Sequence, residues 1–139
     1  MEYRESILAL CSSSPQLPTQ IAKALNTNSM LAGAMLSEMS DKGILKISAL
    51  KIGGSPLYLK PGNESQLLNF TYALKEKDKQ TLTFLQEQKV VRETELDPLT
   101  RVSLSMLKDF AIKLLVEHEG KEEVFWKYFE VSDEEATNR

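Results

Sequence analysis

The chain has few of the residues on which most catalytic and metal sites depend. Of its 139 residues, one is a cysteine, Cys11, and one is a histidine, His118. A single cysteine excludes an internal disulfide framework and a multi-cysteine zinc site, and a single histidine leaves little scope for metal or Ser-His-Asp chemistry. Cys11 completes an apolar helix face, which predicts a core thiol and not a nucleophile. We therefore expect no enzyme activity, no cofactor and no metal site.

Long hydrophobic runs are also missing. No apolar stretch approaches the roughly 18 to 20 residues that span a bilayer. Residues 1–14 include Glu2, Arg4 and Glu5 and lack the unbroken apolar segment of a signal peptide. The sequence therefore predicts a soluble, cytoplasmic protein that has no membrane partner.

Neither sign of charge dominates the whole chain, but the charge is unevenly distributed. The 17 basic and 20 acidic residues give a net charge of −3, which excludes a uniformly basic nucleic-acid coat protein. Residues 1–62 carry six basic and four acidic residues, a net charge of +2, whereas the remainder carries −5. The change of sign falls at Pro61-Gly62. We expect a first domain at 1–62, a second α+β module at 63–131 and a frayed polar tail at 132–139.

The first half has the periodicity of three helices followed by a hairpin. Apolar residues recur at helical spacing over residues 3–11, 17–25 and 31–39. Gly43 is expected at the end of the third helix, and Gly53-Gly54 in a tight turn between two alternating runs, so positive φ angles are predicted at Gly43 and at one or both of the pair.

The second half is predicted to be helical and then to end in a hairpin. A long helix is expected from Glu64 to Lys89, and Asp97-Pro98 has the composition of a helix start. On the helix that follows, Val102, Met106 and Phe110 lie at the spacing of one face. Alternating runs on either side of the turn at residues 118–121 then predict a second hairpin. Together the two halves indicate an α+β fold.

Three helices followed by a two-stranded wing resemble the winged helix-turn-helix superfamily. The residues that carry the resemblance are Leu17–Leu25 for the second helix, Asn28–Lys42 for the third and Leu36–Leu45 for the junction with the wing. The resemblance covers about residues 3–60. It implies that the third helix enters the major groove of double-stranded DNA and that the wing contacts the backbone, as in a transcriptional regulator. The second half is either a second, degenerate winged helix or a helix-and-hairpin extension of the first module.

Two groups of residues are the candidate nucleic-acid contacts. Ser29 and Ser37 lie on the predicted outer side of the third helix, where small hydroxyl side chains let the backbone approach phosphates. On the wing, alternation is expected to place Leu45, Ile47, Leu57 and Leu59 inward and Lys46, Ser48, Tyr58 and Lys60 outward, with Lys51 near the tip. The lysines are also explained without a ligand, because lysine protects exposed strand edges from pairing.

An aromatic cluster at residues 125–129 predicts a protein interface. Consecutive strand residues point to opposite faces, so one pair is expected to fill the core while Trp126 and Tyr128 mark the interface of a homodimer or another protein partner. Burial within the same chain is the alternative explanation. The sequence therefore favours two functions: a non-enzymatic winged-helix protein that binds double-stranded DNA, or a winged-helix protein-interaction adaptor that does not contact nucleic acid.

Overall fold

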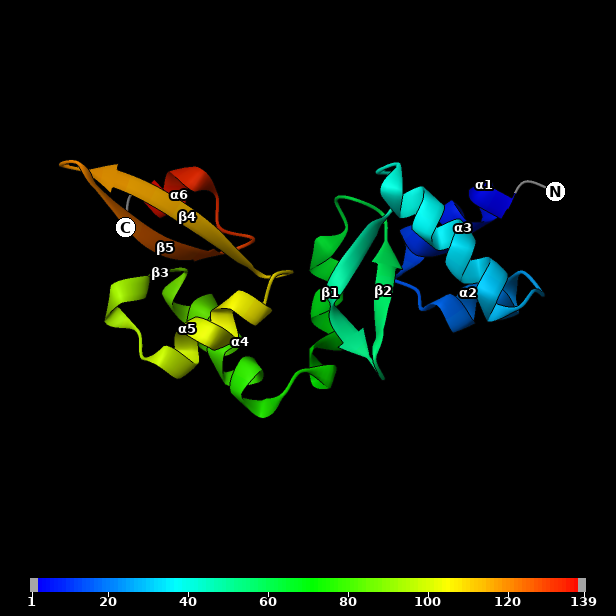
Figure 1. Cartoon of the computed structure of the whole chain (residues 1–139), viewed down its shortest axis with the longest axis horizontal. Coiled ribbons are helices and arrows are strands. Elements are labelled where there is room, and N and C mark those ends of the chain that lie inside the picture. The colour runs from blue at the N-terminus through cyan, green and yellow to red at the C-terminus, as the bar shows by residue number, and fades with distance from the viewer. Residues whose placement is uncertain (1–2, 138–139) are drawn as a thin grey trace. The chain divides into compact units, whose positions relative to one another are not determined.

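The computed structural model describes residues 3–137 and has an α+β fold with two small antiparallel sheets (Figure 1). The chain divides into two compact units, Met1–Ala73 and Leu74–Arg139. The division follows Ala73 and not Gly62, because the 3₁₀ helix η1 (Glu64–Ala73) packs on strand β1 of the first unit. Within residues 3–137, no helix is both long enough and apolar enough to cross a membrane.

Three short helices begin the first unit: α1 (Tyr3–Ser13), α2 (Pro18–Ala24) and α3 (Ser29–Asp41). Asn28 caps α3, because its side chain accepts a hydrogen bond from the Leu31 amide at 2.8 Å. The helix ends at Asp41, and Gly43 follows with a φ of +76°. Gly53 and Gly54 also have positive φ angles, so both predicted glycine positions are confirmed.

The core of the first unit lies where the three helices meet the hairpin. Leu36 of α3 is completely buried beside Ile7 and Cys11 of α1, and Leu25 and Met35 are partly buried against this cluster. The other buried members of this core are Ile21, Ala22, Ala32, Met39, Leu45 and Tyr58.

The hairpin of β1 (Lys46–Ile52) and β2 (Ser55–Leu59) breaks the predicted alternation. Its register runs from Ile47↔Tyr58 to Lys51↔Pro56, so residues 48–50 lie opposite the single residue Leu57. In this bulge Ser48 turns inward, where its hydroxyl donates to the Leu50 carbonyl and accepts from the Leu57 amide. Ser48 is therefore buried and Ile47 exposed, the reverse of the prediction.

The hairpin is covered on both faces. Tyr58 lies in the helical core and is 7% exposed, and its backbone forms two 2.8 Å hydrogen bonds with Gln16. Residues Leu57 and Leu59 alternate with Tyr58 and are also buried. Figure 1 shows the reason: η1 lies along the side of the hairpin opposite the α-helices. The predicted outward position of Tyr58 is therefore wrong.

The second unit consists of four helices and three strands within its described residues. They are α4 (Glu76–Gln88), β3 (Val90–Arg92), the 3₁₀ helix η2 (Glu93–Glu95), α5 (Pro98–Met106), β4 (Ala111–His118), β5 (Lys121–Tyr128) and α6 (Asp133–Thr137). The predicted continuous helix 64–89 is interrupted between η1 and α4. Residues 133–137 form α6 in place of the predicted frayed tail, and residues 138–139 lie outside the described range.

Helix α5 begins where the sequence predicts but faces a different way. Asp97 caps it by accepting a hydrogen bond from the Thr100 amide at 2.7 Å. Val102 and Met106 are 62% and 63% exposed, whereas Leu104 and Leu107 are buried. The predicted apolar face is thus wrong, because Phe110 lies beyond the end of the helix and does not extend that face.

The two units share a topology. In the second unit β3 precedes α5 and pairs antiparallel with β5, the last strand of the hairpin, giving the sheet order β3-β5-β4. In the first unit Gln16 precedes α2 and forms an antiparallel bridge with Tyr58 in β2, again the last strand of the hairpin. Both units have the same order of elements: a helix, a strand-like segment, one or two further helices, and a hairpin.

Candidate nucleic-acid interface

The outer face of α3 carries both predicted serines. Ser29 and Ser37 are exposed, and eight residues of helix separate them by about 12 Å along the axis. Between them the exposed face presents the small side chain of Ala34. Both serine hydroxyls of α3 are therefore on the solvent-exposed part of the helix.

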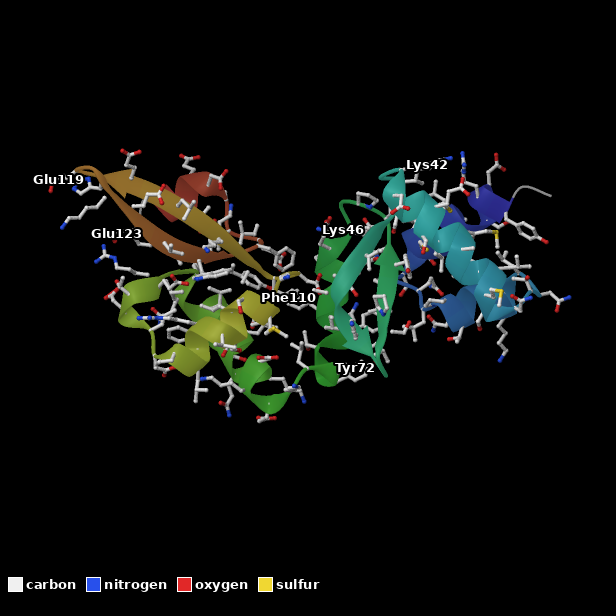
Figure 2. The ribbon with its side chains drawn as sticks, viewed as in Figure 1. Lys42, Lys46, Tyr72, Phe110, Glu119 and Glu123 are labelled. Atoms are coloured by element: carbon white, nitrogen blue, oxygen red, sulfur yellow. The ribbon has the colours of Figure 1, made fainter. Side chains whose placement is uncertain are left out.

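The C-terminal end of α3 is a charged cluster. The Glu38 carboxylate contacts the Lys42 ammonium at 2.9 Å and the Arg4 guanidinium at 3.4 Å (Figure 2 labels Lys42). The hydrogen bond and charge of Lys42, with a smaller contribution from Arg4, hold the pKa of Glu38 below its usual value. Two cations around one carboxylate offset much of the repulsion that Glu38 would exert on a phosphate.

Lys46, at the start of β1, is exposed but already has an anionic neighbour. Its ammonium lies 3.4 Å from the Glu64 carboxylate of η1, and Figure 2 shows Lys46 beside that helix. Partial burial raises the pKa of Glu64, but hydrogen bonds from the backbone amides of Gly62 and Glu64 and the charge of Lys46 outweigh it, so the net shift is downward. A phosphate next to Lys46 would therefore meet an ammonium group whose charge is partly offset by the Glu64 carboxylate.

Lys51 and Lys60 are the two lysines of the hairpin region that the structure leaves exposed without such a neighbour among the described residues. Lys51 pairs in register with Pro56 near the Gly53-Gly54 turn. Lys60 follows the end of β2. The two lysines thus mark opposite ends of the hairpin, and Tyr58 does not join them because it is buried.

Trp126 and Tyr128 do not form the predicted interface. Each is 8% exposed and is held within the second unit. The Trp126 indole N–H donates to a Glu93 carboxylate oxygen at 3.2 Å, and the Tyr128 hydroxyl accepts from Gln86 and donates to Glu130. Both lie on the sheet face that packs toward α4, which explains their burial. Burial, together with Glu130, raises the pKa of Tyr128.

Two exposed residues of α3 were missed by the sequence prediction. Met30 is 83% exposed, and Leu31, the first residue of the apolar repeat over residues 31–39, is 53% exposed. Both lie in the first turn, next to the Asn28 cap. The sequence alone does not determine which of these residues face the core, because the three consecutive apolar residues 30–32 fit more than one orientation of the helix.

The remaining candidate groups for chemistry are not assembled into a site. Burial raises the pKa of the Cys11 thiol to about 11, so it is protonated at neutral pH. His118 is exposed beside the β4–β5 turn and lies 3.9 Å from the Glu119 carboxylate. Within residues 3–137, no three histidine, cysteine or acidic side chains are placed to hold a metal ion.

The chain has a weak structural likeness to a viral protein. No family model and no curated protein matches the chain. A hypothetical protein, PyrSV_gp04 from Pyrobaculum spherical virus, superposes with a TM-score of 0.42 at 18% sequence identity, over 76% of this chain and 69% of that one.

Proposed function

We propose that the first unit is a winged helix that binds double-stranded DNA through α3 and the hairpin, and that the second unit is a degenerate copy of it. The role of such a protein would be transcriptional regulation. The observation that carries the proposal is the order of elements in the first unit: α2 and α3 pack together, and α3 leads directly into a two-stranded hairpin. The shared topology of the two units supports the tandem arrangement.

The surface chemistry supports contact with phosphates more than with base edges. Lys51 and Lys60 are free to pair with phosphate oxygens, and Lys46 contributes partly. The serine hydroxyls of α3 can donate to phosphate oxygens at short range. No arginine lies on α3 to form the bidentate contact with guanine that most often specifies a sequence. We therefore propose weak binding with little sequence preference.

A second function, a protein-interaction module, is favoured by one specific observation. Met30 and Leu31 expose apolar side chains on the helix that would enter the groove. Apolar side chains at this position suit a protein surface, because exposed apolar groups gain most from burial against other apolar groups. In this alternative α3 contacts a protein and not DNA.

The lysine contacts are tested by duplex binding at low salt. Fluorescence anisotropy of a short labelled duplex would compare the parent with Lys51→Ala/Lys60→Ala, and with Lys108→Ala/Lys121→Ala as a control that removes the same charge from exposed sites of the second unit. Loss of two phosphate contacts is expected to weaken binding on the order of tenfold or more, while the control binds like the parent. Equal weakening in both would show that only net charge matters.

The position of α3 is tested by Met30→Glu. If α3 enters the groove, the new carboxylate faces phosphates and weakens binding to every duplex. If α3 faces a protein partner, duplex affinity stays unchanged. A parent that does not bind duplex DNA at low salt makes the protein-interaction module the better description.

A further inference from the structure

Strand β4 is an exposed and apolar edge of its sheet. Within the described part of the chain it pairs only with β5, and the sheet order β3-β5-β4 leaves its other side open. Ile112, Leu115 and Val116 are 40%, 62% and 43% exposed. An edge strand of eight residues with apolar side chains is the kind of edge that natural proteins normally cover or disrupt.

The edge has none of the irregularity that would prevent pairing. All eight residues of β4 are in continuous register with β5, from Ala111↔Tyr128 to His118↔Lys121. A depression of about 470 Å³ adjoins this edge and is lined by Leu114, Leu115, Val116 and Phe125, with Val90, Asp133 and Ala136 around it. The edge is therefore regular and borders further apolar surface.

The sequence of β4 is complementary to itself. When two antiparallel copies are related by a two-fold axis through Leu115, Lys113 of one copy lies opposite Glu117 of the other. The same register places Leu114 opposite Val116, and Leu115 opposite its own copy. A two-fold axis perpendicular to the sheet keeps each sheet face continuous, so only registers that pair residues of the same face are allowed.

The other registers of this kind fit less well. Shifting the axis to Leu114 places Lys113 opposite Leu115 and Ala111 opposite Glu117. Shifting it to Val116 places Leu115 opposite Glu117. Only the axis at Leu115 pairs charged residues with opposite charges and apolar residues with apolar ones throughout residues 113–117.

A feature inside one copy points to the same arrangement. Glu117 lies directly opposite Glu122 of β5, and two carboxylates opposite each other on one face are destabilising. In the two-fold register, the ammonium of Lys113 from the other copy comes beside Glu117 on its open side. The second copy thus offsets a repulsion that each isolated copy retains.

We propose that the protein forms a homodimer by antiparallel pairing of β4 with β4 of a second copy, centred on Leu115, which joins two three-stranded sheets into one of six strands. The occupant of the edge is a second copy because the charge pattern of β4 complements itself. The proposal stands independently of whether the first unit binds DNA.

Charge reversal tests both the dimer and its register. Sedimentation equilibrium would follow the full chain from about 5 μM to about 0.5 mM, the range in which a weak dimer dissociates. Lys113→Glu alone places carboxylates opposite each other at two symmetric positions, and Glu117→Lys alone places ammonium groups there. Each single variant is expected to dissociate on the order of tenfold more readily than the parent.

Two further samples that restore the opposite charges decide whether the register is right. The double variant Lys113→Glu/Glu117→Lys restores both pairs and is expected to regain the parent's association. An equimolar mixture of the two single variants is expected to form a heterodimer more readily than either forms a homodimer. Circular dichroism of the monomeric form checks that each variant folds: Lys113→Glu should unfold near the parent's midpoint because its side chain is exposed. Glu117→Lys should unfold at a slightly higher temperature, because it replaces the Glu117–Glu122 repulsion with an attractive pair.

Two results would overturn the proposal. A parent that stays monomeric throughout the concentration range shows that β4 does not pair with a second copy, whatever else the edge binds. A dimeric parent whose association is not changed by the single reversals, or whose association is lost in them but is not recovered in the double variant and the mixture, contradicts the Leu115-centred pairing.

Discussion

The outer strands of the two hairpins, β1 in the first unit and β4 in the second, hold equivalent places in the shared topology but differ in chemistry. β1 carries Lys46 and Lys51 and contains the bulge that turns Ser48 inward. β4 is regular and exposes Ile112, Leu115 and Val116. A bulge disrupts strand pairing, whereas a regular edge permits it. The one lysine of β4, Lys113, has Glu117 on the same strand to complement it in a second copy. One topology therefore carries a bulged hairpin edge with exposed lysines in the first unit and a regular, apolar edge in the second.

The difference extends to net charge. The first unit, residues 1–73, has six basic and five acidic residues, whereas residues 74–139 have eleven and fifteen. A net charge of +1 against −4 makes the second unit the less favourable surface for DNA. The charge difference therefore supports placing the proposed nucleic-acid contact on the first unit and the proposed self-association on the second.

The largest expected effect is on unfolding free energy, and it tests whether the cores of the two units are independent. Leu36→Ala and Leu104→Ala each remove a completely buried side chain and should each cost about 2 to 5 kcal/mol of unfolding free energy. Hydrogen exchange should show the loss of protection within residues 3–73 for the first and within residues 74–137 for the second. Equal loss across both units in either variant would show that they fold as one cooperative body.

The next effect concerns the bulge that distinguishes β1 from β4. Ser48→Ala removes the hydroxyl that bonds the Leu57 amide and the Leu50 carbonyl and should cost about 1 to 3 kcal/mol. Ser37→Ala is the matched control, because that hydroxyl is exposed on α3. Chemical denaturation measures both. If the two variants are equally stable, the Ser48 hydroxyl does not maintain the bulge.

The same bulge explains what the sequence could and could not predict. The three helices, both hairpins, the Asn28 and Asp97 caps and the turn glycines were predictable, because each depends on local periodicity or backbone conformation. Which way hairpin residues face was not predictable from alternation alone, because Trp126 and Tyr128 are buried even though the β4–β5 register is continuous. In β1–β2 the two-residue shift moved Ser48 inward and Ile47 outward, and no local signal in the alternating pattern marked it.

Non-local packing accounts for the other errors. Tyr58 is buried because the helical core takes one face of the hairpin and η1 covers the other, and Trp126 and Tyr128 are buried because α4 packs on their face of the sheet. β3 was missed because three residues carry too little periodicity to identify a strand. The candidate site thus retained its exposed serines and lysines but lost its aromatic residues.

A smaller effect concerns Lys46, which pairs with Glu64 and is also a candidate phosphate contact. Lys46→Ala removes an exposed ion pair with Glu64 and should cost less than about 1 kcal/mol near pH 7. Because the folded-state pKa of Glu64 lies below its usual value, this contribution is present above that value and is lost as pH falls through the folded pKa. Denaturation of parent and variant at pH 7 and near pH 3 should show the difference shrink. A difference that is unchanged or larger in acid would contradict the Lys46–Glu64 pair.

The salt dependence of duplex binding tests most directly whether the first unit contacts DNA through the phosphates. Each phosphate contact lowers log affinity by about 0.9 per unit of log salt concentration, so Lys51, Lys60 and the shared Lys46 predict a slope of about −2 to −3 per chain. Lys51→Ala/Lys60→Ala should make the slope shallower by about 2, equally on two duplexes of unrelated sequence, because phosphate contacts carry no sequence information. A parent whose binding does not depend on salt, or a variant with the parent's slope, would contradict DNA binding by this hairpin.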